Sequence, residues 1–150
     1  MACPGWETRP VRLTDEDCWA GLRSAEHGVL CTTSATGAID VVPTCLAVVG
    51  QRIVTPIDTV KAKVTTELGR RKNLDRDVAA TLLCEHWDSD NWSRLWWVRA
   101  RLVLLPDQDG AEYEAALRAK YVQYRTAAFA AVLVFDVTST LGWAAVEPDR

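Results

Sequence analysis

The chain alternates between short runs of strand-like hydrophobicity and segments of helical periodicity. Strand-like runs cover 29–34, 39–49, 52–57, 78–87, 91–105 and 130–139, which predicts six β-strands. Residues 13–28, a loop and helix within 58–77, and 107–126 predict three helices. The strands follow one another through short connections without strict β–α alternation. We therefore expect an antiparallel sheet or barrel with helices packed on it.

Local signals mark several element ends. Thr14 can cap the first helix, with Asp17 at the position of a capping-box acid. Gly50 and the residue after it fit a two-residue hairpin turn. Asp109 has capping-box spacing before the last helix.

The strand predicted over 91–105 has two unlike faces. One face is entirely apolar and should point into the core: Trp96, Val98, Ala100, Leu102 and Leu104. The other carries Trp97 beside Arg99 and Arg101, a mixture that suits a subunit interface or a site for an anionic, planar ligand. The alternative is an exposed strand on which an arginine stem covers Trp97.

The run 39–49 is apolar on both faces, whereas a strand of a monomeric barrel normally has one polar face. We therefore expect either a helix over this strand or a second subunit against it. Pro43 within the run indicates a sheet edge or a bulge.

Composition narrows the class of protein. The 150 residues are 49% hydrophobic and 25% charged, as expected for one soluble globular domain spanning 1–150. The formal net charge of −3 argues against a general nucleic-acid binder. Five cysteines without a C-x-x-C pair fit reduced thiols. With no secretory signal at the start and no apolar run of about 18 residues, we expect a cytoplasmic protein without a membrane partner.

Positive charge gathers between residues 61 and 76, where six lysines and arginines face two acids. Lys61 and Lys63 lie in the loop before the predicted helix, so they can hold a phosphate together with the free backbone donors of the first turn. The alternative is a solvated helix face. Aromatic residues are not interleaved with this segment, which disfavours nucleic-acid stacking.

No motif for a self-sufficient catalytic site is present. The sequence lacks G-x-S-x-G, G-x-x-x-x-G-K-[ST], G-x-G-x-x-G and H-E-x-x-H. Cys84, His86 and Asp88 share one strand face, but alternating positions on one strand rarely close a tetrahedral site, so no metal is expected. No catalytic side chain can be named, and an enzyme with this sequence would need a cofactor.

Three blocks of sequence point to a known family. They are the D-x-x-K-x-K loop at 58–63, the L-x-R-x-x-N-L helix end at 68–74 and the D-x-D-x-W-x-x-L-W-W-V-R block at 88–99. In order and spacing they resemble the pyridoxamine-5′-phosphate-oxidase-like (PPOX-like) split-barrel flavoproteins. The similarity spans residues 20–105 and a fitting stretch at 135–145. It looks closest to the actinobacterial branch that uses the 8-hydroxy-5-deazaflavin coenzyme F-420.

The resemblance implies a mainly β fold with packed helices, a six-stranded antiparallel split β-barrel like that of FMN-binding proteins. It also implies a homodimer with two cofactor sites at the interface. Carried over by position, the cofactor-binding residues are Thr55, Pro56 and Ile57 along the ring, Lys61 and Lys63 on the phosphate, Arg71 and Asn73 supporting that loop, and Trp92 and Trp97 in the shielding and dimer-forming block.

The function that the resemblance implies is an oxidoreductase that uses coenzyme F-420 to transfer a hydride to or from a small organic substrate. FMN is the alternative cofactor, in a PPOX-type oxidoreductase. A non-catalytic carrier of a flavin or deazaflavin is the alternative to an enzyme. A haem-binding split barrel is more remote, because His27 and His86 are the only histidines.

Overall fold

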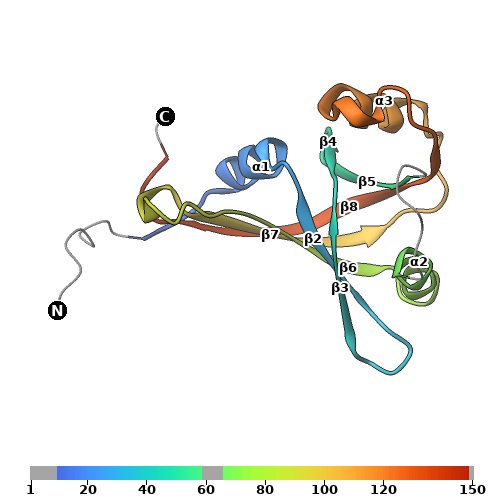
Figure 1. Ribbon diagram of the computed structural model, residues 1–150. Helices are drawn as coiled ribbons and strands as arrows, with labels where there is room; N and C mark the ends of the chain where they lie inside the picture. The colour runs from blue at the N-terminus through green and yellow to red at the C-terminus, as the bar shows by residue number, and fades with distance from the viewer. Residues whose placement is uncertain (1–9, 59–65, 149–150) are drawn as a thin grey trace.

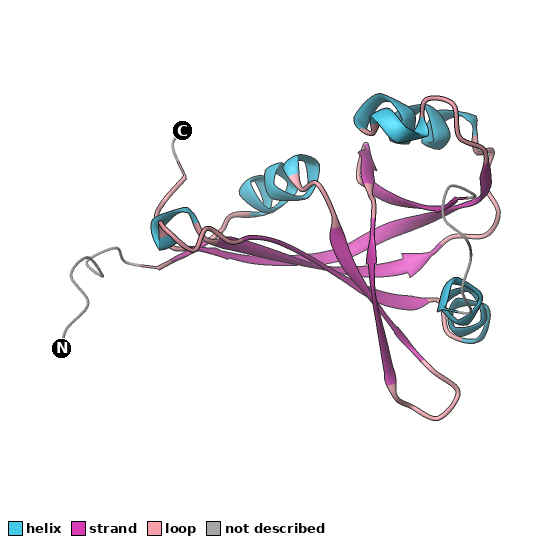
Figure 2. Cartoon of the chain, in the orientation of Figure 1, coloured by secondary structure: helices cyan, strands magenta, loops and turns pink. Residues whose placement is uncertain are grey.

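A curved antiparallel sheet with helices packed on it forms the fold (Figures 1 and 2). The computed structural model describes residues 10–58 and 66–148. Its strands are β1 (Val11–Arg12), β2 (Gly28–Thr33), β3 (Ile39–Thr44), β4 (Ala47–Val49), β5 (Arg52–Asp58), β6 (Ala79–His86), β7 (Trp96–Leu104) and β8 (Phe129–Ala144). Its helices are α1 (Asp15–Ser24), α2 (Thr66–Arg76), α3 (Ala111–Lys120) and the short 3-10 helices η1 (Trp92–Arg94) and η2 (Val122–Tyr124). The predicted mainly β architecture with three packed α-helices is confirmed.

The described part of the chain has eight strands, and the prediction of six is wrong. The run 39–49 breaks at Cys45 and Leu46 into β3 and β4, and the two-residue β1 pairs with the end of β8. β8 also continues to Ala144 instead of ending at residue 139. Hydrophobic periodicity did not detect the break, because both halves belong to one continuous apolar run.

The strand order makes the sheet curl. The order is β3-β2-β6-β7-β8-β5-β4, and every pairing is antiparallel. β3 and β4 occupy opposite edges, yet only two residues separate them in the chain, so the two edges must approach each other there. Pro43 lies on the edge strand β3, which confirms the edge position that proline indicated.

Two apolar clusters hold the helices on the sheet. The larger lies between α1 and the inner face of the sheet and includes Leu22, Leu30, Leu82, Ala100 and Phe135. The predicted core face of β7 is confirmed, since Val98, Ala100 and Leu102 are all buried. The smaller cluster lies beneath α3 and includes Val54, Tyr113, Leu117, Tyr124 and Val134.

Most of the predicted helix caps and turns are confirmed. Thr14 caps α1, because its Oγ1 accepts the Asp17 amide hydrogen at 3.2 Å. Gly50 turns β4 into β5 with a φ of 60°, a conformation that favours glycine. The capping box at Asp109 is wrong, because its carboxylate accepts from the Ala111 amide instead of capping further into α3. No helix of the described ranges is both long and apolar enough to cross a membrane.

Candidate functional site

The residues predicted to line a cofactor ring lie at the end of β5, where one strand edge is uncovered. β4 pairs only with Arg52–Val54, so beyond Val54 the described part of the chain provides β5 with a strand partner on the β8 side alone. Thr55 and Pro56 are buried and Ile57 is half-buried. Beyond Val54 this edge therefore has no neighbouring strand within the described ranges, as a strand-edge contact with a ring requires.

A buried arginine stands at this edge. Arg70 of α2 is 4% exposed, and it donates to the Pro56 carbonyl from Nη2 and to the Thr44 hydroxyl from Nη1, each at 3.4 Å. It thereby ties the end of β5 to the end of β3. A guanidinium does not lose its proton in proteins, so this corner carries a fixed positive charge.

The sequence analysis named Arg71 as a residue that supports the loop before α2. In the structure the neighbouring Arg70, and not Arg71, contacts the end of β5. Arg71 is on the outside of α2, where it pairs with Asp75 at 3.4 Å and with Asp107 at 3.9 Å. The signal for Arg70 was present, since Arg70, Asn73 and Leu74 have the i, i+3, i+4 spacing of one buried helix face. Arg70 is also the arginine of the L-x-R-x-x-N-L pattern.

Asn73 fastens α2 to the β2–β3 hairpin. Its Nδ2 donates to Thr32 Oγ1 at 3.0 Å and to an Asp40 carboxylate oxygen at 2.7 Å. Arg76 strengthens the same junction by donating to the Thr33 carbonyl. Asn73 therefore fixes α2 against the β2–β3 hairpin. The predicted phosphate ligands Lys61 and Lys63 fall outside the described residues.

The two predicted tryptophans lie at the other end of the sheet, beside α1 (Figure 1). Trp92 belongs to η1 and is 46% exposed, with its ring centroid 5.6 Å from that of Trp87. Trp97 is half-buried on the outer face of β7.

One chain does not bring these tryptophans to the β5 edge. Trp97 pairs with Trp143 of β8, whereas Ile57 pairs with Ala131 of the same strand. Those two partners are twelve positions apart on β8, which corresponds to about 40 Å measured along the strand. The predicted set is therefore divided between two ends of the molecule.

The outer face of the sheet is largely apolar. Direct cross-strand pairing from β3 through β8 places these residues on it: Val29, Ile39, Val41, Leu83, Trp97, Leu141 and Trp143. Ile39 is 61% and Val41 57% exposed. Arg99 and Arg101 lie in the middle, and Arg101 donates to Thr81 on β6 at 2.9 Å. Glu85, Thr81 and Ser139 share this face by direct pairing, so its apolar residues surround a polar centre.

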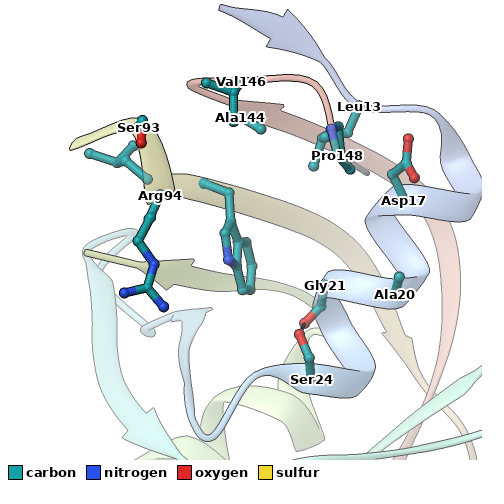
Figure 3. Close-up of a pocket in the computed structure, with 12 residues that line it drawn as sticks. Leu13, Asp17, Ala20, Gly21, Ser24, Ser93, Arg94, Ala144, Val146 and Pro148 are labelled. Carbon is teal, nitrogen blue, oxygen red and sulfur yellow. Dashed lines mark hydrogen bonds between the residues drawn. The ribbon is translucent and has the colours of Figure 1, made fainter. Parts of the chain in front are cut away.

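A pocket of about 370 Å³ lies between α1 and η1 (Figure 3). Most of its lining is apolar, including Ala20 and Gly21 of α1 and Ala144 at the end of β8. Asp17 and Arg94 line opposite walls. Sequence analysis did not find this pocket, because its walls come from three segments that are far apart in the chain, within 13–24, 93–96 and 144–148.

Buried polar groups also gather where α3 meets the β3–β4 corner. The Tyr121 hydroxyl accepts from the Leu46 amide at 3.0 Å and donates to the Glu26 carbonyl at 2.9 Å, and burial raises the pKa of Tyr121 to about 12. Burial likewise raises the pKa of Cys84 to about 12 and lowers that of Lys120. Since the thiolate is the reactive form of cysteine, Cys84 is not an activated nucleophile at neutral pH.

Cys84, His86 and Asp88, which the sequence analysis considered as metal ligands, lie in different environments. Cys84 is buried in the core, and His86 is exposed with its ring stacked on Trp96. Asp88 organises its own turn by accepting from the Asn91 amide at 3.1 Å. Within 10–58 and 66–148, no group of three or more histidine, cysteine, aspartate or glutamate side chains is arranged to hold an ion.

The fold is similar to several solved structures. An FMN-binding protein from Syntrophomonas wolfei subsp. wolfei is 16% identical with a TM-score of 0.63, over 91% of this chain and 90% of that chain. A putative pyridoxamine 5′-phosphate oxidase from Corynebacterium glutamicum is 10% identical with a TM-score of 0.60, over 90% and 97%. An F-420 reductase is 19% identical with a TM-score of 0.53, over 81% and 93%.

No protein-family model matches the sequence, and no curated protein matches it. The structural similarities, at these low identities, are similarities of fold. They confirm that the chain has the fold of the PPOX-like split-barrel proteins.

Proposed function

We propose that this protein is an oxidoreductase that binds a flavin-type cofactor, with coenzyme F-420 favoured over FMN. The observation that carries the proposal is the uncovered end of β5, with the buried cation of Arg70 fixed against it. Main-chain groups at a strand edge suit the polar rim of a flavin ring. A fixed positive charge beside a lysine-containing loop suits a phosphate. The donor set therefore fits the cofactor class.

The residues at this end would bind and orient. Lys61 and Lys63 would hold the phosphate, while Thr55, Pro56 and Ile57 would align the ring along the strand edge. Arg70 and Asn73 would keep the loop between two fixed elements. A bound flavin or deazaflavin supplies hydride transfer, so this chain needs no nucleophile of its own. A small organic substrate would complete the reaction.

We further propose that the site is shared by two copies of the chain. Trp92 and Trp97 belong to the predicted cofactor set but lie about 40 Å of strand away from the β5 edge. A second copy on the apolar outer face would bring its tryptophans toward this edge and shield the ring from water. This arrangement also accounts for Val41 and Ile39, which are apolar and exposed.

Titration of the purified protein with F-420 and, separately, with FMN tests the cofactor. We expect F-420 fluorescence to change on binding, and Lys61→Ala with Lys63→Ala to weaken binding by about tenfold or more, because each charge-assisted contact contributes roughly 1.5–3 kcal/mol. Yellow protein on isolation would favour FMN. Binding of neither cofactor, or binding unchanged by the double substitution, would contradict the proposed site.

A further inference from the structure

We propose that the pocket between α1 and η1 binds a small organic cation with an apolar or aromatic body (Figure 3). This is a second site, because it lies at the opposite end of the sheet from the β5 edge. The proposal depends neither on the cofactor nor on the dimer.

The pocket is built around the rigidly held indole ring of Trp96. Gly21 of α1 allows close contact with this ring: a Cβ at position 21 would lie 3.2 Å from Trp96 Cζ3 and 3.1 Å from Val98 Cγ2. The ring of His86 stacks against Trp96, with centroids 6.5 Å apart and planes 19° apart. Held by α1 and by His86, the indole forms a wall that needs little reorganisation when a ligand enters.

Trp96 separates two adjoining pockets of different character. The first, of about 370 Å³, is mainly apolar and falls within the size range of small-molecule sites. The second, of about 490 Å³, is more polar and is lined by Glu26, Glu85 and both histidines of the chain. A ligand with an apolar body in the first pocket would therefore have its polar group near the second.

The charges of the residues that line the two pockets decide which polar group of a ligand can bind there. Arg94 lines both pockets but is already paired with Asp88 at 3.2 Å, so this pair is neutral. Asp17 lines the first pocket, and the described residues give its carboxylate only a neutral hydroxyl partner, Thr14 at 2.8 Å. Glu85 pairs directly with Trp97 and so shares the outer face of the sheet, which leaves two carboxylates, those of Asp17 and Glu26, in the pockets that share Trp96.

This combination recognises an ammonium group. An indole face attracts a cation with a free energy of about 0.5–2 kcal/mol, and carboxylates nearby add Coulomb attraction. An anion would meet two like charges, and Arg94 would have to give up Asp88 to bind it. The structure thus assigns the pocket to an amine and not to an acid of the same shape.

The test compares three probes of one shape: 2-phenylethylamine, the neutral 2-phenylethanol and the anionic 3-phenylpropionate, each titrated calorimetrically at low salt. We expect the amine to bind with one site per chain, and the acid to bind about tenfold more weakly or not at all. Asp17→Asn is expected to weaken amine binding by roughly threefold, since it removes the carboxylate that lines the first pocket and keeps the shape.

Ala20→Trp locates the site. Ala20 is an exposed α1 residue on the pocket wall, so a large side chain there fills the pocket without disturbing the core. Ala115→Trp is the matched control, since Ala115 is an exposed residue of α3. The amine should fail to bind Ala20→Trp and bind the control normally. Equal binding of amine and alcohol, tighter binding of the acid, or full binding to Ala20→Trp would each overturn the proposal.

Discussion

Arg70 and Arg71 are neighbours in sequence with opposite environments. Arg70 is 4% exposed and donates hydrogen bonds to the Pro56 carbonyl and the Thr44 hydroxyl. Arg71 is partly exposed and forms ion pairs with two surface acids, Asp75 and Asp107. Buried hydrogen bonds from a charged group are costly to lose, and surface ion pairs contribute little.

Substitution of each arginine by methionine separates these roles. Arg70→Met should lower the free energy of unfolding by roughly 1–3 kcal/mol, because it leaves buried acceptors without their donor. Arg71→Met should change it by less than about 0.5 kcal/mol. Urea unfolding followed by tryptophan fluorescence measures both. Equal effects of the two substitutions would show that Arg70 does not fix the β5 edge.

Lys120 breaks the rule that buried charges are paired. Its Nζ is buried, and within the described residues it has no hydrogen-bond partner. Burial lowers the pKa of Lys120 below that of the unfolded chain, because the charged form loses its water. Protonation therefore favours the unfolded state.

Lys120→Met should stabilise the protein by about 1 kcal/mol at pH 7, since a buried polar group without a partner costs free energy. The sign with pH follows from the lowered pKa. The free-energy cost of burying the charged Lys120 is fully present below the pKa of Lys120 in the folded state. This cost disappears as the pH rises to the pKa of Lys120 in the unfolded state, near 10.5. The stability gap between variant and wild type should therefore narrow between pH 7 and pH 10 in urea unfolding. A gap that widens over this interval would contradict the assignment.

At the scale of elements, substitution of glycine by alanine is expected to have opposite effects on stability at Gly142 and Gly69. Gly142 of β8 lies beneath α1, where a Cβ would approach Cys18 Sγ and Leu13 Cδ1 to 2.9 Å each. Gly69 lies inside α2, and a Cβ there would have no neighbour within 4 Å beyond its own helix.

Gly142→Ala should destabilise the fold by about 1–3 kcal/mol, because the added methyl group forces α1 away from the sheet. Gly69→Ala should stabilise it by roughly 0.5–1 kcal/mol, because alanine favours the helix. Thermal unfolding followed by circular dichroism gives both values. If Gly142→Ala were as stable as wild type, α1 would not be packed closely on β8.

The elements were easier to predict than their arrangement. Alternation of apolar residues identified the inner face of β7, since each side chain there meets the same core. The break at Cys45 escaped detection, because an unbroken apolar run carries no sign that its halves join opposite edges of one sheet. Arg71 was carried over by position from the resemblance, which does not say which helix face is buried. Contacts between distant segments, such as the bond between the Leu46 amide and the Tyr121 hydroxyl, depend on how the elements pack, which one sequence does not specify.

At the scale of the whole molecule, the long strands β7 and β8 separate two ends of the sheet. The β5 edge lies at one end, and η1 with the start of β7 lies at the other (Figure 1). Between them the outer face is apolar with Arg99 and Arg101 at its centre. A stable dimer needs about 800 Å² of surface from each partner, which a five-stranded face can provide.

Leu83→Arg tests the dimer and its link to cofactor binding. Leu83 is on the outer face and pairs with Arg99, so a new cation there adds like-charge repulsion to lost apolar contact. We expect wild type to sediment as a dimer and Leu83→Arg as a monomer. Val122→Arg, which changes an exposed valine of η2 near α3, should remain dimeric.

The monomeric variant should also bind F-420 at least about tenfold more weakly, because in the proposed dimer one chain would supply the β5 edge and the other the tryptophans. Sedimentation velocity and fluorescence titration on the same samples give both quantities. A monomeric wild type would refute the dimer. A monomeric Leu83→Arg that still bound the coenzyme fully would show that one chain completes the site, and Trp92 and Trp97 would then have no part in it.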